Sequence, residues 1–169
     1  SGSSIGVTRV DDPTQFRNAF ETAFEASESV MVESFLDGRE FTCGVIPSSP
    51  GGAPRYLPVT EIIPDNAFFD YEAKYAGKSS EVTPADIDDA LTLDMQQRAL
   101  LVYQDLDCSG MARVDFILHN GTPHVVEVNT VPGFSEMSII PQQAQVVGIS
   151  STELISLLIG DALQRSSFQ

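Results

Sequence analysis

The pattern of apolar and polar positions predicts helices and strands in alternation along this chain. Apolar residues recur at three- and four-residue intervals over residues 13–26, which predicts an amphipathic helix with Asp12 as its N-cap. A second helical pattern runs over residues 83–106, with Thr83 as N-cap and Pro84 in the first turn. Short apolar runs bounded by turn residues predict strands at 30–35, 40–46 and 55–63.

The rest of the pattern completes a mixed helix and strand fold. Residues 64–83 lack regular periodicity, and a segment of that length between two elements favours a binding loop or lid. Residues 135–147 predict a loop and a short helix, and Ser151 or Thr152 caps a last helix. This order of elements predicts an α+β fold with helices packed on a largely antiparallel sheet.

Two apolar runs in the second half of the chain carry charged residues on one face. They cover residues 111–118 and 124–129, and His119-Asn120-Gly121 between them is a hairpin signal. Strands that bury one face rarely place charged residues together unless something binds there. Two carboxylates and an amide oxygen are hard ligands that hold Mg²⁺ against phosphate. The candidate residues are Arg113, Asp115, Glu127 and Asn129.

The register of this hairpin decides whether the two carboxylates meet. A three-residue loop pairs Leu118 with Thr122 and places Asp115 diagonal to Glu127 on one face. A two-residue turn at Asn120-Gly121 shifts the pairing by one residue and separates the two carboxylates. A metal site therefore requires an odd loop or a bulge, and an ordinary hairpin with a solvated charged face is the alternative. With the odd loop, the opposite face collects a core set of Val114, Phe116, Val126 and Val128.

Composition and charge limit the partners of the chain. The 169 residues carry a net charge of −15 with only two lysines, Lys74 and Lys78, which disfavours nucleic acid as a partner. No apolar run approaches the ~20 residues that span a bilayer, and the first residues lack the basic segment of a signal peptide. Two cysteines are too few for a disulfide framework, so we expect reduced thiols and a cytoplasmic protein.

Five separated motifs, taken in order, are specific although each is weak alone. They read GSSIGV at 2–7, ESFLDGREF at 33–41, FDYEAKY at 69–75, RVD at 113–115 and EVNTVPG at 127–133. This set resembles the C-terminal part of the D-alanine–D-alanine ligases, which belong to the ATP-grasp superfamily. The resemblance covers nearly the whole chain. It implies a single domain over residues 1–169, a fragment that lacks the N-terminal domain and the first half of the ATP-grasp fold.

The resemblance implies an enzyme that joins two D-alanines for peptidoglycan synthesis. In this family ATP phosphorylates the carboxylate of the first D-alanine, and the amine of the second attacks the acyl phosphate. Mg²⁺ (or Mn²⁺) bridges the phosphate oxygens so that charge can redistribute. Because the missing part supplies further lysines and a glutamate, we expect the fragment alone to be inactive.

The same resemblance assigns the charged hairpin its roles. It implies that Asp115, Glu127 and Asn129 hold Mg²⁺. Arg113 would reach the first substrate and the oxyanion of the intermediate, which suits a rigid donor fork with a permanent charge. Gly133 would let the backbone approach that oxyanion.

The remaining roles concern the nucleotide, the loop and the second substrate. The resemblance implies adenine contacts by Glu33, Ser34 and Leu36, ribose contacts by Glu40, phosphate contacts by Lys74, a closed-site pair of Ser3 with Tyr75, and contacts of Ser138 and Ile139 with the carboxylate of the second D-alanine. We expect residues 64–80 to be mobile or displaced when no nucleotide is bound.

Other functions stay open at this point. The chain could belong to another ATP-grasp ligase, with D-lactate or D-serine as second substrate or with a different carboxylate and amine, or to a non-catalytic module that binds Mg-nucleotide. Zinc chemistry is poorly supported, because His119 and His124 are the only histidines. Family members are often homodimers through the part that we expect to be missing, so the sequence does not decide the oligomeric state.

Overall fold

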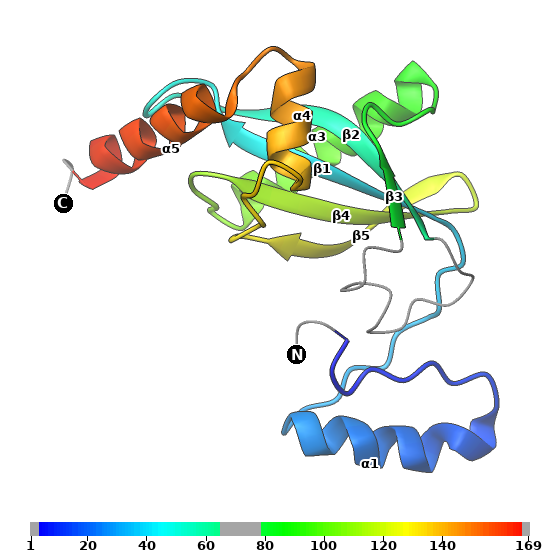
Figure 1. Cartoon of the computed structure of the whole chain (residues 1–169). Coiled ribbons are helices and arrows are strands. Elements are labelled where there is room, and N and C mark those ends of the chain that lie inside the picture. Colours follow the sequence, from blue (N-terminus) through cyan, green and yellow to red (C-terminus); the bar gives the residue numbers. More distant parts are fainter. Residues whose placement is uncertain (1–3, 65–78, 167–169) are drawn as a thin grey trace. The chain divides into compact units, whose positions relative to one another are not determined.

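The computed structural model describes residues 4–64 and 79–166, which form two compact units (Figure 1). The first unit comprises the described residues up to Leu36, and the second begins at Asp37. Each unit is described by itself, and the single domain expected over residues 1–169 stays a prediction. Predicted features that lie outside the described residues are Ser3, Lys74, Tyr75 and most of the expected lid at 64–80.

The first unit contains the capped helix that the pattern predicts. A 3₁₀ turn, η1 (Pro13–Gln15), leads into α1 (Phe16–Ala26). The Asp12 carboxylate accepts a hydrogen bond from the Thr14 amide at 2.8 Å, which caps this start and lowers the pKa of Asp12. The helix predicted over residues 13–26 is therefore confirmed, with a first turn that is tighter than an α-helix.

The strand predicted over residues 30–35 is wrong. This segment has no regular secondary structure in the first unit. A run of apolar residues becomes a strand only when another strand satisfies its backbone groups, and none of the described residues pairs with it. Its side chains are mostly exposed, and Phe35 lies under the guanidinium of Arg9, 3.9 Å from the ring centroid.

The second unit is built on an antiparallel sheet of five strands in the order β3-β2-β1-β4-β5 (Figure 1). Two of the strands confirm the predictions at 40–46 and 55–63, and two form the expected hairpin. The fifth, β3, lies inside the stretch predicted as a loop over 64–83 and pairs with the end of β2, so that loop is shorter than expected. The strands are β1 (Arg39–Pro47), β2 (Pro54–Pro64), β3 (Ser79–Val82), β4 (Ala112–His119) and β5 (Thr122–Asn129).

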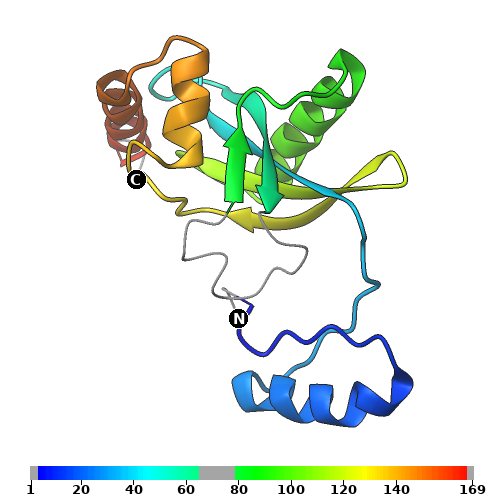
Figure 2. The ribbon, with the colours of Figure 1, turned by 45° about the vertical axis from the view of Figure 1, so that its right-hand side comes forward.

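Helices cover both faces of this sheet, as Figure 2 shows from a second angle. The helix α3 (Asp89–Asp105) packs on one face, whereas α4 (Ile139–Val146) and α5 (Ser151–Ser166) lie on the other. The α+β architecture that the sequence predicts is therefore confirmed. The α3 face buries Phe41, Cys43, Val45, Val59, Met95, Ala99, Tyr103, Ala112, Val114 and Phe116. The α4 face buries Ile46, Leu57, Ile140, Ala144 and Leu154.

The helix α3 begins five residues later than the N-cap prediction at Thr83 allows. Its N-cap is Asp88, whose Oδ1 accepts a hydrogen bond from the Leu91 amide at 2.9 Å. The segment before it is held against β2 instead. The Ala85 amide donates to the Val59 carbonyl at 2.8 Å, and the Thr83 hydroxyl lies 2.6 Å from that of Thr60. Tertiary contacts with β2 therefore override the local start signal.

The cap of α5 is Ser150, one residue before the predicted Ser151 or Thr152. The Ser150 hydroxyl accepts from the Glu153 amide at 3.3 Å, and the Glu153 carboxylate accepts from the Ser150 amide at 2.8 Å. This reciprocal pair is a capping box. Hydrogen bonds from the Ser150 hydroxyl and amide lower the pKa of Glu153.

Both cysteines are free thiols. Cys43 is fully buried in the α3-facing core, and this burial raises its pKa to about 12. Cys108 is half-buried. Among the described residues, no single helix has the length and apolar character to cross a membrane; α4 and α5 meet those criteria only as a pair, with a bend of 107° between them.

We expect Asp88→Ala to lower the free energy of unfolding by about 1 kcal/mol, because the first turn of α3 loses its capping acceptor. Chemical denaturation followed by circular dichroism measures this change. Asp86→Ala, two residues upstream, removes a carboxylate that caps no helix and is the matched control. Equal losses in the two variants would contradict the assignment of the cap.

Candidate functional site

The turn of the β4–β5 hairpin differs from the predicted three-residue loop. His119 pairs with Thr122, so only Asn120 and Gly121 form the turn. Both have positive φ angles, 50° and 75°, which is the backbone of a type I′ turn. Asparagine tolerates this left-handed conformation better than other residues with side chains. The two-residue turn is therefore the one that these residue types favour.

A β-bulge then restores the contact that this turn alone would remove. The pairing shifts between Asp115 and Phe116, because Phe116 pairs with Val125 while Asp115 pairs directly with Glu127. Val126 is the extra residue, and it is 53% exposed rather than part of the predicted core face. The requirement for an odd loop or a bulge is thus met by the bulge, and the two carboxylates stand opposite each other.

The charged residues of the hairpin lie on the sheet face that carries α4. Their neighbours in β4, Val114 and Phe116, point into the core under α3, and side chains alternate along a strand. A cross-strand row runs through Thr60, Thr42, Asp115 and Glu127, as the three pairings in order show. The next row pairs Arg113 with Asn129.

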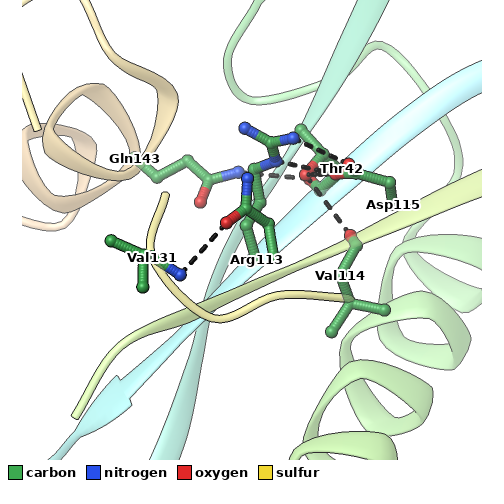
Figure 3. Close-up of polar contacts among 7 residues, drawn as sticks. Thr42, Arg113, Val114, Asp115, Val131 and Gln143 are labelled. Atoms are coloured by element: carbon green, nitrogen blue, oxygen red, sulfur yellow. Dashed lines mark hydrogen bonds and ion pairs between the residues drawn. The ribbon is translucent and has the colours of Figure 1, made fainter. Parts of the chain in front are cut away.

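Arg113 and Asp115 form a two-point ion pair at the centre of this face (Figure 3). The Nε and Nη2 atoms of Arg113 each donate to one carboxylate oxygen of Asp115 at 2.8 Å. The side chains are only 21% and 19% exposed. The hydrogen bonds to Asp115 raise the pKa of Arg113 against the opposing effect of burial, and the charges of Asp115, Glu127 and Glu81 add to the rise. The guanidinium is thus a permanent cation among three carboxylates.

The other two candidate ligands flank this pair. The Asn129 Oδ1 accepts a hydrogen bond from the Val131 amide at 3.1 Å, which holds the amide group at the end of β5. Glu127 is exposed beside Asp115. Among residues 4–64 and 79–166, no three His, Cys, Asp or Glu side chains gather into a metal cage. Two carboxylates and one amide oxygen fit a Mg²⁺ ion that also keeps water and phosphate ligands.

A depression of about 220 Å³ lies beside the ion pair on the same face. It brings together four of the residues that the sequence singles out, namely Arg113, Gly133, Ser138 and Ile139. Its remaining lining residues are Glu81, Pro132, Met137 and Ile140. A small polar molecule in this depression would contact the cation of Arg113 on one side and the start of α4 on the other.

Two small residues shape the α4 end of this depression. Ser138 is the N-cap residue of α4, but its hydroxyl makes no capping bond in that helix. Instead it accepts from the Ser135 amide at 3.0 Å and lies 2.9 Å from the Ser135 hydroxyl. A Cβ at Gly133 would approach the Ser138 Oγ to 2.9 Å, so a larger residue there would displace this hydroxyl.

The proposed nucleotide contacts are divided between the two units. Glu40 lies in β1, paired with Ile117 one step from the Thr42–Asp115 pair, and so shares their face. Glu33, Ser34 and Leu36 belong to the first unit, where Glu33 and Ser34 are exposed and Leu36 is half-buried. The structure thus gathers the residues assigned to the cation, the oxyanion and the second substrate, with Glu40 nearby.

Sequence reasoning missed three polar residues on the same face. Thr42 and Gln143 are completely buried, and Glu81 lines the depression with Arg113. A signal existed for Thr42, which is a polar residue among the apolar residues of its strand, whereas Gln143 is one of three glutamines in α4 and does not stand out. Their partners are 73 and 101 positions away, so the pattern could not show what they contact.

A family model described as "D-ala D-ala ligase C-terminus" matches residues 1–160. The chain belongs to this family. It is 48% identical over 165 residues to a D-alanine–D-alanine ligase of Christiangramia forsetii, which covers 98% of this chain and 50% of that protein. The chain therefore spans about half the length of the curated relatives it matches.

Solved structures agree with the family. A D-Ala:D-Ser ligase, VanG, from Enterococcus faecalis superposes with a TM-score of 0.82 at 36% identity, covering 95% of this chain and 46% of that one. A D-alanine–D-alanine ligase from Bacillus anthracis complexed with ATP gives a TM-score of 0.75 at 33% identity, covering 92% and 49%. The fold described above is therefore that of the C-terminal half of these ligases.

We expect Asp115→Asn to lower the free energy of unfolding by about 1–3 kcal/mol, because the half-buried guanidinium of Arg113 loses its charged acceptor. Urea denaturation at neutral pH measures the loss. Glu127→Gln makes the same chemical change on the exposed neighbour and should shift stability by less than ~0.5 kcal/mol. A loss in E127Q as large as in D115N would contradict the central place of the ion pair.

Proposed function

We propose that the complete protein is an ATP-dependent ligase that joins two D-alanines through an acyl phosphate, for peptidoglycan synthesis. The observation that supports this most strongly is the position of Arg113. It pairs with Asp115 beside Glu127 and at the same time lines the depression with Gly133, Ser138 and Ile139. The Arg113 guanidinium therefore lies between the proposed cation ligands and a depression that could hold a small substrate. The chain belongs to the D-Ala D-Ala ligase family.

In this proposal Asp115, Glu127 and Asn129 hold Mg²⁺ or Mn²⁺, which neutralises the charge of the ATP phosphates. Direct pairing of Asp115 with Glu127 supports the assignment, because a cross-strand pair places both side chains next to each other on one face of the sheet. Arg113 supplies a permanent charge where an oxyanion develops, and the N–H groups that are not bonded to Asp115 remain as donors to it. The two bonds from Nε and Nη2 to Asp115 hold the guanidinium in place before substrate arrives.

The start of α4 is the proposed place of the second D-alanine. Ser138 and Ile139 would bind its carboxylate, and the backbone at Gly133 would approach the oxyanion. The short distance from a Gly133 Cβ to the Ser138 Oγ supports this, because a larger residue at position 133 would displace the hydroxyl that lies beside this backbone. Backbone amides at a helix start also favour a bound anion.

The nucleotide contacts complete the proposal. Glu33, Ser34 and Leu36 would bind adenine and Glu40 the ribose hydroxyls. Lys74 would bind the phosphates, and Tyr75 would pair with Ser3 across the closed site. The part of the relatives that this chain does not span would supply the other half of the site. We further propose that the complete enzyme is cytoplasmic, where ATP is available, and that it forms a homodimer through that other half.

A second candidate keeps the reaction and changes the second substrate to D-serine. It is favoured by one specific observation, the structural similarity to a D-Ala:D-Ser ligase at 36% identity. D-serine adds one hydroxyl to D-alanine, so the two substrates differ by a single polar group in the depression. The depression combines the apolar Met137, Ile139 and Ile140 with the polar Glu81, Arg113 and Ser138, so turnover with each substrate is what separates the two candidates.

We expect the complete protein, with the N-terminal half that its relatives carry, to release ADP from ATP and Mg²⁺ only when D-alanine is present. A coupled ADP assay measures this, with mass spectrometry of the dipeptide. The 169-residue chain alone should show no release, because half of the site is missing. ADP release by the complete protein that is independent of D-alanine would contradict the proposal, and faster turnover with D-serine in the acceptor role would replace it by the second candidate.

We expect Arg113→Lys in the complete protein to lower kcat by about 100-fold, because one ammonium cannot both keep the two-point pair with Asp115 and direct further N–H donors at the oxyanion. The KM for ATP should change little, since the arginine is assigned to the oxyanion. Arg98→Lys is the matched control, because that arginine pairs with Asp94 on the exposed side of α3. An unchanged kcat in R113K would contradict the assignment.

A further inference from the structure

A buried hydroxyl supports the central carboxylate from inside the sheet. The Thr42 Oγ1 donates a hydrogen bond to the Asp115 Oδ1 at 2.6 Å (Figure 3). Thr42 is 0% exposed, and its cross-strand pairing with Asp115 places the two side chains on the same face. The same Oδ1 accepts from the Arg113 Nε, so two donors converge on one oxygen.

A buried glutamine from α4 holds the backbone of this threonine. The Gln143 Nε2 donates to the Thr42 carbonyl at 3.1 Å and to the Thr60 Oγ1 at 2.9 Å. Its Oε1 accepts from the Gly44 amide at 3.0 Å. Gln143 is also 0% exposed, so these bonds are shielded from water. The side chain amide thus ties α4 to β1 on both sides of Cys43.

The sheet itself creates the need for this glutamine. The pairing of β1 with β2 shifts register between Cys43 and Val45, so the ladder is irregular at Gly44. Buried backbone groups need a partner, and the Gln143 amide supplies one for the Gly44 N–H. A Cβ at Gly44 would lie 2.6 Å from the Gln143 Oε1, so only glycine admits the side chain.

We propose that Thr42 and Gln143 are positioning residues, which hold the Asp115 carboxylate in the orientation that binds the divalent cation. The inference rests on the proposed function, in which Asp115 is a cation ligand. Residues 138–140 at the start of α4 line the depression, and Gln143 lies one helical turn further along. The relay Gln143–Thr42–Asp115 therefore connects the proposed site of the second substrate with the proposed cation site.

A carboxylate that binds a cation has to be held in one orientation. The terminal torsion of an aspartate is broad, so the group can rotate unless its oxygens are bonded. Arg113 bonds both oxygens, but its own side chain is long and partly exposed. The Thr42 hydroxyl is anchored on a buried strand, and it directs Oδ1 inward. Loss of such a partner behind a metal ligand typically weakens metal binding 10- to 100-fold.

The sequence offers a matched pair of buried threonines for the test. Thr42 and Thr60 are cross-strand neighbours, both 0% exposed, and both contact Gln143. Only the Thr42 hydroxyl bonds Asp115. Thr42→Val and Thr60→Val each replace a buried hydroxyl by a methyl group of similar size. T42V removes the bond to the carboxylate, whereas T60V removes the bonds of its hydroxyl to Gln143 and Thr83 and leaves the Thr42–Asp115 bond in place.

The experiment measures Mn²⁺ binding to the complete protein by EPR, with saturating ADP in place of ATP so that no turnover occurs. We expect T42V to raise the Mn²⁺ dissociation constant about 10-fold or more, T60V by less than ~3-fold, and Thr42→Ser to restore tight binding. Thermal unfolding of each variant reports stability separately. Thr42→Ala is the second variant if T42V does not fold.

The glutamine is tested in the same assay. Gln143→Met keeps the length of the side chain and loses its hydrogen bonds. We therefore expect it to raise the Mn²⁺ dissociation constant, as T42V does. Gln96→Met is its control, because the Gln96 Nε2 donates to the Leu57 carbonyl from α3 and does not touch the relay. The double variant T42V/Q143M should bind no more weakly than the product of the single effects predicts, since both act through Asp115.

Three results would overturn the inference. Equal shifts in T42V and T60V would mean that Thr42 acts only through stability. Unchanged Mn²⁺ binding in T42V would mean that Asp115 needs no support from the strand. Failure of the unsubstituted protein to bind Mn²⁺ at all would remove the proposed cation site, and with it the proposed function, which the first two results leave standing.

Discussion

One extra residue in β5 is the constraint on which the rest of this site depends. With the two-residue turn at Asn120-Gly121, a regular ladder would place Asp115 opposite Val126 and Glu127 opposite Val114. Glu127 would then point into the core under α3, where an unpaired charge is costly. The bulge lets Val126 stay outside and turns Glu127 to the face of Asp115. Turn chemistry and burial conflict here, and the bulge is the arrangement that satisfies both.

The two faces of the sheet consequently carry different kinds of residues. The α3 face is a continuous apolar core that makes the sheet rigid. On the α4 face the apolar core is confined to one end, and the rest carries a half-buried ion pair, an exposed carboxylate and a depression. Rigid strands that place their side chains at fixed positions suit a site that must hold several charges a few ångströms apart. Hydrogen bonds from Gln143 to Thr42 and from Thr42 to Asp115 connect α4 with this carboxylate.

Local signals predicted most elements, because the apolar periodicity and the capping residues that define those elements lie within or next to them in the sequence. The spacing of Phe16, Phe20 and Phe24 and the Asp12 cap specify α1, whose rings lie 5.9 and 6.3 Å apart along one side. The errors arose where a distant partner decides the outcome. Residues 30–35 resemble a strand but have no partner among the described residues. Thr83 resembles an N-cap but instead bonds Thr60 in β2.

The sequence by itself determined the family and the candidate site residues, since motif residues such as Arg113, Asp115 and Glu127 are recognised by type and order. It also determined the α+β class, because helical and strand periodicities are local properties. Only the tertiary structure decided how those residues meet: that the hairpin has a bulge, that Glu81 faces the depression, and that Thr42 and Gln143 stand behind Asp115. The physical reason is that register and cross-strand contacts are settled by packing between segments far apart in the chain, and no local pattern encodes that packing.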